Sequence, residues 1–306
     1  MSGTTYKVGY GTASGGSAVI VAVDDGPWYA MDQPGPAGEP PPADLLEAVR
    51  SWDEWSARFD AVAVGDWPAS SVTPADVTFE RPLVGDKLLC IGANYDDHIA
   101  EMDVPRPPWP YSFIVPPTTT LVLSDAPVTI PRDIQWWDWE AEVAVVLGQR
   151  LRYAPVEECL AAVAGYVPLN DLSARDSGAT KIAFGIDMVM VKAHDDSKVI
   201  APLLTPAQFV PDPQDLHVTC TVNGVLKQDM HTSTMIFTVA ECLSHLSSIM
   251  TLEPGDIVTT GTGGGVGILQ DPPEALAAGD VVVVAVDGLG SATTVMQTYE
   301  RELVKA

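Results

Sequence analysis

Two glutamates in the segment Trp139-Glu140-Ala141-Glu142 have residue types and a spacing that could do chemistry. An apolar run follows them, and a strand alternates its side chains, so both carboxylates are predicted to lie on one face. Two carboxylates at such a short distance repel each other and raise each other's pKa. A bound cation is the simplest compensation for this repulsion. The alternative, which is more common for an isolated pair, is that both glutamates face solvent at a sheet edge.

A third carboxylate shifts the balance toward the cation. The apolar residues 163–169 end in Asn170-Asp171, which places Asp171 at a strand end, within reach of a site on a neighbouring strand. Three carboxylates form an all-oxygen ligand set that suits a hard cation such as Mg²⁺, Mn²⁺ or Ca²⁺. The alternative for Asn170-Asp171 is turn chemistry, because both residue types favour turns.

A histidine and a glutamate upstream form a candidate acid–base pair. If residues 96–102 are helical, His98 and Glu101 lie three positions apart on one face. A surface contact between the two side chains is the alternative.

The glycine-rich residues 261–267 could offer backbone N–H groups to an anion, although alone they would most often be a tight turn. They match neither a dinucleotide fingerprint nor a Walker loop, so a nucleotide is not indicated.

The candidate residues must be positioned by short segments that favour β-strands and are separated by residues that interrupt regular structure. Strands are predicted at residues 17–23, 87–91, 142–147, 163–169, 216–222, 256–260 and 281–286. Helical spacing covers residues 43–58 and about 155–162, and a capping box of Thr238 and Glu241 starts another helix. Residues 34–42 and 66–80 read as irregular, so we predict a small N-terminal domain over 1–80 and a main domain over 81–306. The balance indicates a β-rich α+β fold.

Composition excludes several classes of partner. The formal net charge of −25 repels nucleic acid and anionic membranes, and it would repel an anionic substrate unless a local cation reversed the field. No apolar run is long enough for a membrane helix and no signal peptide is visible, so we expect a soluble, cytoplasmic protein. The four cysteines are far apart, which argues against a zinc site or a disulfide framework.

The ordered set of motifs over about residues 84–296 resembles the fumarylacetoacetate hydrolase (FAH) family. The segments that carry the resemblance are Gly92–Met102, Trp139–Glu142, Gly165–Asp176, Val222–Gly224, Gln228-Asp229, Thr232–Phe237 and Leu252–Gly267. The resemblance implies a mixed β-sandwich roll behind a small N-terminal α/β domain, usually assembled as a homodimer.

The resemblance also implies a role for each candidate residue. Three carboxylates would bind Mg²⁺ or Mn²⁺, namely Glu140, Glu142 and Asp171. Two residues would activate water or move protons, namely His98 and Glu101. Three residues would hold the substrate, namely Arg175, Lys192 and Thr262.

The implied chemistry begins with a 2-oxo acid or β-dicarbonyl substrate, a small anionic molecule. Such a compound chelates the cation, which stabilises the enolate formed when a neighbouring C–C bond breaks. We therefore expect a metal-dependent hydrolase or lyase. The alternatives are an isomerase, hydratase or decarboxylase of a 2-oxo-enoic acid on the same scaffold, or a catalytically silent ligand-binding paralogue. A silent paralogue is disfavoured because His98, Glu101 and all three carboxylates are present.

Three positions depart from the family pattern. Family members usually carry a Lys where Val115 stands, a Gln near Gly178 and a Pro where Gly263 stands, and the stretch between Lys192 and Pro202 is longer than usual here. Losing a cation and an amide predicts weaker binding of a small polar diacid and room for a larger or more apolar substrate. Highest activity on short acylpyruvates or oxaloacetate would contradict that hypothesis.

Overall fold

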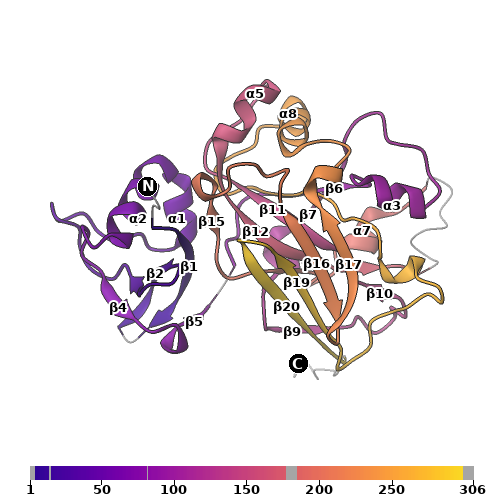
Figure 1. Ribbon diagram of the computed structural model, residues 1–306, viewed down its shortest axis with the longest axis horizontal. Coiled ribbons are helices and arrows are strands. Elements are labelled where there is room, and N and C mark those ends of the chain that lie inside the picture. The colour runs from indigo at the N-terminus through magenta and orange to yellow at the C-terminus, as the bar shows by residue number, and fades with distance from the viewer. Residues whose placement is uncertain (1–3, 14, 81, 177–184, 299–306) are drawn as a thin grey trace, which may run out of the picture.

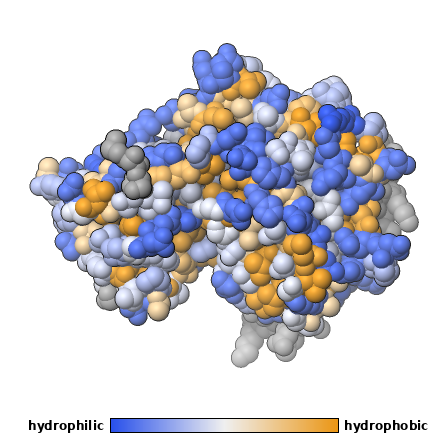
Figure 2. Space-filling view, viewed as in Figure 1, coloured by the Kyte–Doolittle hydropathy of each residue, from blue (hydrophilic) through white to orange (hydrophobic). Residues whose placement is uncertain are grey.

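The computed structural model describes residues 4–13, 15–80, 82–176 and 185–298 (Figure 1). Gly178, one of the departures from the family pattern, lies outside these residues. Hydrophilic residues predominate on the face shown in Figure 2, with apolar patches between them. All four cysteines are free, in line with the prediction against a disulfide framework, and all four are buried. Among the described residues, no helix combines the length and apolar character needed to cross a membrane.

The N-terminal part is an antiparallel sheet with two helices. Its strands have the order β4-β3-β2-β1-β5, with bounds β1 (Tyr6–Ala13), β2 (Gly16–Val23), β3 (Trp28–Ala30), β4 (Ser70–Val72) and β5 (Thr78–Phe79). The helical stretch predicted over 43–58 forms α1 (Leu45–Arg50) and α2 (Trp52–Ala63), which meet at Ser51. The prediction that 66–80 is irregular was wrong, because the short strands β4 and β5 pair with the distant strands β3 and β1.

A mixed eight-stranded sheet forms the centre of the larger part. Its order is β7-β6-β18-β11-β12-β14-β8, with β15 also paired to β12. The bounds are β6 (Leu88–Gly92), β7 (Tyr111–Val115), β8 (Leu121–Leu123), β11 (Ala141–Leu147), β12 (Val163–Asp171), β14 (Lys198–Ile200), β15 (Thr205–Pro206) and β18 (Ile257–Thr259). The predicted strands at 87–91, 142–147, 163–169 and 256–260 all lie in this sheet.

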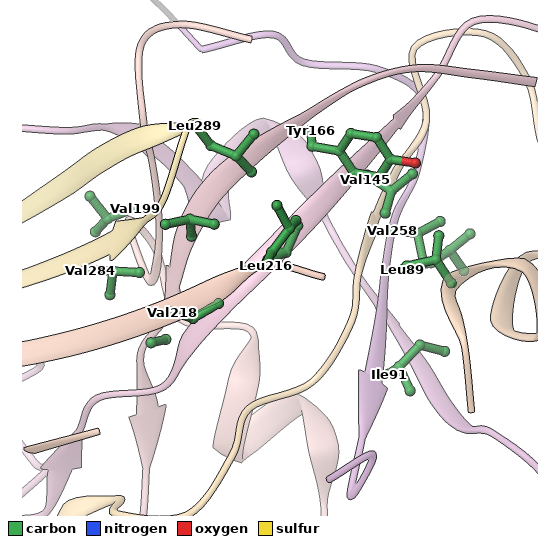
Figure 3. Close-up of a cluster of buried hydrophobic side chains, with 14 of the residues drawn as sticks. Leu89, Ile91, Val145, Tyr166, Val199, Leu216, Val218, Val258, Val284 and Leu289 are labelled. Atoms are coloured by element: carbon green, nitrogen blue, oxygen red, sulfur yellow. The ribbon is translucent and has the colours of Figure 1, made fainter. Parts of the chain in front are cut away.

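A five-stranded sheet packs on one face of the eight-stranded sheet. Its order is β17-β16-β19-β20-β9, with bounds β9 (Pro127–Thr129), β16 (His217–Val222), β17 (Val225–His231), β19 (Val281–Val286) and β20 (Gly290–Gln297). Figure 3 shows apolar side chains from both sheets in one cluster, with Val199 of the eight-stranded sheet beside Val284 of the five-stranded sheet. A separate two-stranded ladder pairs β10 (Trp137–Asp138) with β13 (Ser173–Ala174).

Both faces of the eight-stranded sheet are buried. Val143 and Val145 of β11 point into the core between the two sheets, while Ala144 and Val146 point into a second core shared with the N-terminal part. A strand buried on both faces reads as a continuous apolar run, which is why residues 143–147 carry no polar side chain. The position of Glu142 follows from this alternation, since it lies on the same face as Ala144.

Short helices surround the sheets. They are α3 (Asp96–Glu101), α4 (Pro117–Thr120), α5 (Val156–Cys159), α7 (Met188–Lys192) and α8 (Val239–Ile249). The predicted capping box of α8 is confirmed, because Glu241 N–H donates to Thr238 Oγ1 at 3.2 Å and Thr238 N–H donates to a Glu241 carboxylate oxygen at 2.8 Å. The fold is a β-rich α+β fold, as the sequence predicts.

The N-terminal part contacts the larger part through backbone as well as side chains. Val8 of β1 and Leu204 exchange two backbone hydrogen bonds of 2.9 and 2.8 Å. Trp52 of α2 packs against Gly148, where an added Cβ would lie 3.0 Å from the Trp52 side chain. The division near residue 80 stays a prediction, since the two parts share one hydrophobic core.

Replacing Gly165 with alanine tests how closely β12 and β15 approach. A Cβ at Gly165 would lie 2.3 Å from the carbonyl oxygen of Thr205, and backbone cannot move aside cheaply. We expect Gly165→Ala to lower the free energy of unfolding by about 1–3 kcal/mol in urea denaturation. Gly15→Ala is the control, because its Cβ would meet only Asp32 at 3.5 Å. Equal stability of the two variants would contradict the close approach.

Candidate active site

Three carboxylates meet at one end of the eight-stranded sheet. Glu140 precedes β11, Glu142 lies near its start and Asp171 is the last residue of β12. The ladder between β11 and β12 brings them together, because Asp171 N–H donates to the Glu140 carbonyl at 2.8 Å. All three are buried, and one oxygen of each lies within 4.8 Å of the other two. The structure thus places the predicted metal ligands in one cluster.

Three cations contact this cluster. Lys192 Nζ lies 2.5 Å from Glu140 Oε2 and 3.0 Å from Asp171 Oδ2. Lys198 Nζ lies 2.7 Å from Asp171 Oδ1, and Arg175 donates to Glu140. Two of the predicted substrate-binding residues, Arg175 and Lys192, are therefore beside the carboxylates.

Burial and neighbouring charges act differently on the two glutamates. Burial alone would raise the pKa of Glu140, but Lys192 and Arg175, with a smaller effect of His98, bring it down to about 2. Burial raises the pKa of Glu142 well above its ordinary value, and the charges of Asp171 and Glu140 raise it further. Glu142 is the carboxylate that the nearby cations compensate least.

The donor set fits a divalent cation. Asp171 Oδ1 is buried and accepts no hydrogen bond from the described residues, since its contact with Lys198 lacks hydrogen-bond geometry. Glu142 Oε2 accepts a backbone hydrogen bond from Gly261 N–H at 2.7 Å, which leaves it a further lone pair. A cation at this point would offset the repulsion between the carboxylates and use lone pairs that protein donors leave free.

The predicted acid–base pair forms on α3. Residues 96–101 are helical, and His98 Nδ1 lies 2.7 Å from Glu101 Oε1, which leaves His98 Nε2 for a substrate or water. Glu101 Oε2 accepts a hydrogen bond from Gly265 N–H at 3.0 Å, so the glycine-rich loop orients the pair. Asn94 anchors the start of this segment by donating to the Thr260 carbonyl at 2.9 Å.

Gln228 connects Thr262, the third predicted substrate-binding residue, to β11. Its Nε2 donates to Thr262 Oγ1 at 2.8 Å and to the Gly263 carbonyl at 3.0 Å, and its Oε1 accepts from Ala141 N–H at 2.9 Å. Thr262 is buried beside Gly261, whose N–H donates to Glu142. The structure therefore brings Thr262 close to the carboxylate cluster.

Asp138 organises the same site from behind Arg175. Its carboxylate accepts hydrogen bonds from Trp139 N–H at 2.8 Å, Gly267 N–H at 2.7 Å and Ile268 N–H at 3.2 Å, and from Arg175 Nε at 3.1 Å. Burial raises the pKa of Asp138, and Arg175 acts against that rise. Asp138 fixes Arg175 toward Glu140 and holds the end of the glycine-rich loop.

The family model for the fumarylacetoacetate hydrolase C-terminal domain matches residues 87–297. The chain belongs to the fumarylacetoacetate hydrolase family. It is 37% identical over 223 residues to a mitochondrial oxaloacetate tautomerase of Bos taurus, and the match covers 71% of this chain and 68% of that protein. The segments that carry the resemblance, from Gly92 to Gly267, all lie within the range that the family model matches.

Two solved structures of the family have the same fold. A fumarylacetoacetate hydrolase from Exiguobacterium antarcticum superposes with a TM-score of 0.77 at 28% identity, covering 96% of this chain and 100% of the other. Fumarylpyruvate hydrolase from Pseudomonas aeruginosa, in complex with Mn²⁺ and pyruvate, gives a TM-score of 0.62 at 29% identity and covers 70% and 90%. The chain is an enzyme of this family, which contains hydrolases and tautomerases.

The sequence motifs assigned no role to three side chains at the site, namely Asp138, Lys198 and Gln228. Each left a weak signal, because each is a polar residue in or beside a strand. Lys198 is the clearest example, since it precedes the apolar residues Val199 to Ala201 and is fully buried. A buried lysine needs a partner, so its position in an apolar strand indicates a nearby carboxylate.

Two departures from the family pattern have local structural reasons. Val115 lies in the hydrophobic core shared with the N-terminal part and faces Leu88 across the ladder. Gly263 N–H donates to Met230 Sδ at 2.9 Å, and a Cβ at Gly263 would lie 2.6 Å from that sulfur. Proline at this position would lose the N–H and collide with Met230, so glycine and Met230 fit each other.

Replacing Asp138 with asparagine tests its place in the site. The amide nitrogen would face either the donors of Ile268 and Arg175 or those of Trp139 and Gly267, because each pair now donates to one carboxylate oxygen. We expect Asp138→Asn to lower the free energy of unfolding by about 3 kcal/mol. The control is Asp24→Asn in the surface pair with Lys7, where the loss should stay under about 1 kcal/mol. A loss at Asp138 no larger than that of the control would contradict this role.

Proposed function

We propose that the chain is a divalent-metal-dependent enzyme that acts on an anionic 2-oxo acid or β-dicarbonyl compound. The observation that carries the proposal is the buried cluster of Glu140, Glu142 and Asp171, which repel each other without a cation and together offer an all-oxygen ligand set. Membership of the family supports it, and so does the Pseudomonas aeruginosa fumarylpyruvate hydrolase, whose structure is a complex with Mn²⁺ and pyruvate.

Glu140, Glu142 and Asp171 would hold the metal, either Mg²⁺ or Mn²⁺. When bound, the cation would stabilise negative charge that develops on the keto oxygen of the substrate. Arg175 and Lys192 supply positive charge for the substrate carboxylate, and Thr262 supplies a hydroxyl held by Gln228. These cations are local exceptions in a chain of net charge −25, so they direct an anion to this site.

His98 is the proposed proton carrier. Because its Nδ1 is held by Glu101, Nε2 is the free nitrogen that takes a proton from water and later returns it. In hydrolysis, the hydroxide adds to the second carbonyl carbon, two bonds from the keto carbon, and the C–C bond between that carbonyl and the intervening carbon breaks. The electron pair of this bond stays on the intervening carbon of the 2-oxo fragment, which then takes the proton held by His98, while the attacked carbonyl leaves as a carboxylate. Cleavage of a C–C bond is our first proposal for the reaction.

Tautomerisation is the second candidate, and it has a specific reason. The Bos taurus relative is named an oxaloacetate tautomerase. The same residues would serve, since moving a proton between carbon and oxygen beside a 2-oxo acid needs the base at His98 and no attack by water.

The homodimer, the cytoplasmic location and the absence of nucleic-acid or membrane partners remain predictions from the sequence.

Replacing Glu142 with glutamine tests the metal centre. We expect Glu142→Gln to weaken Mn²⁺ binding at least about a hundredfold and to abolish activity, because one of three ligand charges is lost. Mn²⁺ titration followed by electron paramagnetic resonance measures the first effect, and assays on acylpyruvates and oxaloacetate measure the second.

The control for Glu142 is Glu54→Gln, which removes only the surface partner of Arg58 on α2. This variant should keep the Mn²⁺ affinity and the activity of the original chain. Activity that survives both Glu142→Gln and EDTA would refute the metal-dependent mechanism.

Replacing His98 with asparagine tests the proton carrier. We expect His98→Asn to keep Mn²⁺ affinity within a few fold and to lower kcat by about 10²–10⁴. His245→Asn on α8 is the matched control and should leave kcat unchanged. Solvent deuterium incorporation at the carbon beside the keto group distinguishes the two candidate reactions, because a tautomerase exchanges that hydrogen without producing fragments. Unchanged kcat in His98→Asn would rule out the proposed role.

A further inference from the structure

Lys198 is a second lysine at the carboxylate cluster and has no role in the proposed reaction. It is the first residue of β14 and lies directly opposite Asp171 in the ladder with β12. Its side chain has no exposed surface, and its Nζ lies 2.7 Å from Asp171 Oδ1. Cross-strand partners of opposite charge point to the same face of a sheet, so the ladder itself creates this contact.

The ammonium group of Lys198 is fully occupied by oxygen atoms from different segments. Its three hydrogen bonds go to the Lys192 carbonyl at 2.6 Å, Ser197 Oγ at 2.9 Å and the Leu172 carbonyl at 3.4 Å. The contact with Asp171 adds an ion pair. Breaking a buried arrangement of this kind is costly, because the oxygens left behind lose a partner in a medium without water.

The contact with Lys192 connects two parts of the site. The Lys192 side chain reaches Glu140 and Asp171, whereas its carbonyl is held by Lys198 and, through a 3.1 Å hydrogen bond, by Ser197. Lys192 is the last residue of α7, a helix of only five residues whose Val189 and Met190 are largely exposed. Val191 is buried and His194 Nε2 lies 2.8 Å from the Met190 carbonyl, so the helix has other contacts. Lys198 and Ser197 are the groups that contact the Lys192 carbonyl itself.

We propose that Lys198 is a positioning residue that locks Lys192 in place against the third metal ligand, Asp171. The ammonium group of Lys198 holds both the backbone carbonyl of Lys192 and the carboxylate of Asp171. The substrate-binding lysine and the metal site therefore keep a fixed geometry. The coupling to metal and substrate rests on the proposed function, whereas the positioning of α7 can be measured without either.

Hydrogen exchange of the full chain without added metal tests the positioning directly. Val191 N–H donates to the Asp187 carbonyl and Ala193 N–H to the Val189 carbonyl, so both amides report on α7. We expect these amides to exchange about tenfold faster in Lys198→Met, with a smaller increase in Ser197→Ala. The matched control is Lys87→Met, which removes another lysine that pairs at 2.7 Å with a buried carboxylate, that of Asp256, outside the site.

Unchanged exchange of the α7 amides in Lys198→Met would overturn the proposal, and so would a rise spread equally over the whole chain. If Lys198→Met fails to fold, Ser197→Ala decides, since it removes one of the two groups that hold the Lys192 carbonyl. Unchanged protection of α7 in that variant would also overturn it.

Binding of oxalate to the Mn²⁺-loaded chain tests the coupling. We expect Lys198→Met to weaken oxalate binding about tenfold, and the double variant with Lys192→Met to bind no worse than Lys192→Met alone, because Lys198 acts through Lys192. Additive losses would show that Lys198 acts independently and would overturn the proposal. If the original chain binds no Mn²⁺, the proposed function fails, while the exchange experiment still decides the positioning.

Discussion

Mutual repulsion among three buried carboxylates is the constraint on which the site depends. The ladder between β11 and β12 forces Glu140, Glu142 and Asp171 together, where water cannot screen their charges. Burying charge without compensation costs several kcal/mol per ion, so cations must be supplied from elsewhere in the fold. Glu140 receives them and keeps a low pKa, whereas Glu142 remains undercompensated and is the natural place for an added cation.

The surrounding architecture supplies both the burial and the partners. The eight-stranded sheet is covered on one face by the five-stranded sheet and on the other by the core shared with the N-terminal part. The end of that second face holds the carboxylates. Helices and loops add further polar groups to this site. Helix α3 carries the His98–Glu101 pair, and the glycine-rich loop orients the pair through Gly265. A rigid sheet thus fixes the charges while shorter segments provide the groups that are proposed to contact substrate.

Family membership narrows the chemistry to the hydrolase, isomerase and tautomerase reactions for which its members are named. The proposed metal ligands and the proposed acid–base pair match the family pattern, and both candidate reactions, hydrolysis and tautomerisation, would use them. Two local contacts lie beside the charge cluster, namely that of Gly263 with Met230 and that of Lys198 with the Lys192 carbonyl.

The sequence by itself determined the local elements and the chemical types. Apolar runs predicted the central strands, the Thr238 capping box predicted α8, and the order of motifs identified the family and the candidate residues, because these signals lie within a few neighbouring positions. Tertiary structure alone decided the partners. Short strands such as β4 and β5 exist only through distant pairing, and Gln228 meets Ala141 across 87 positions of the chain. The convergence of Asp138, Lys198 and Gln228 on the site depends on ladder register and packing, which no local pattern encodes.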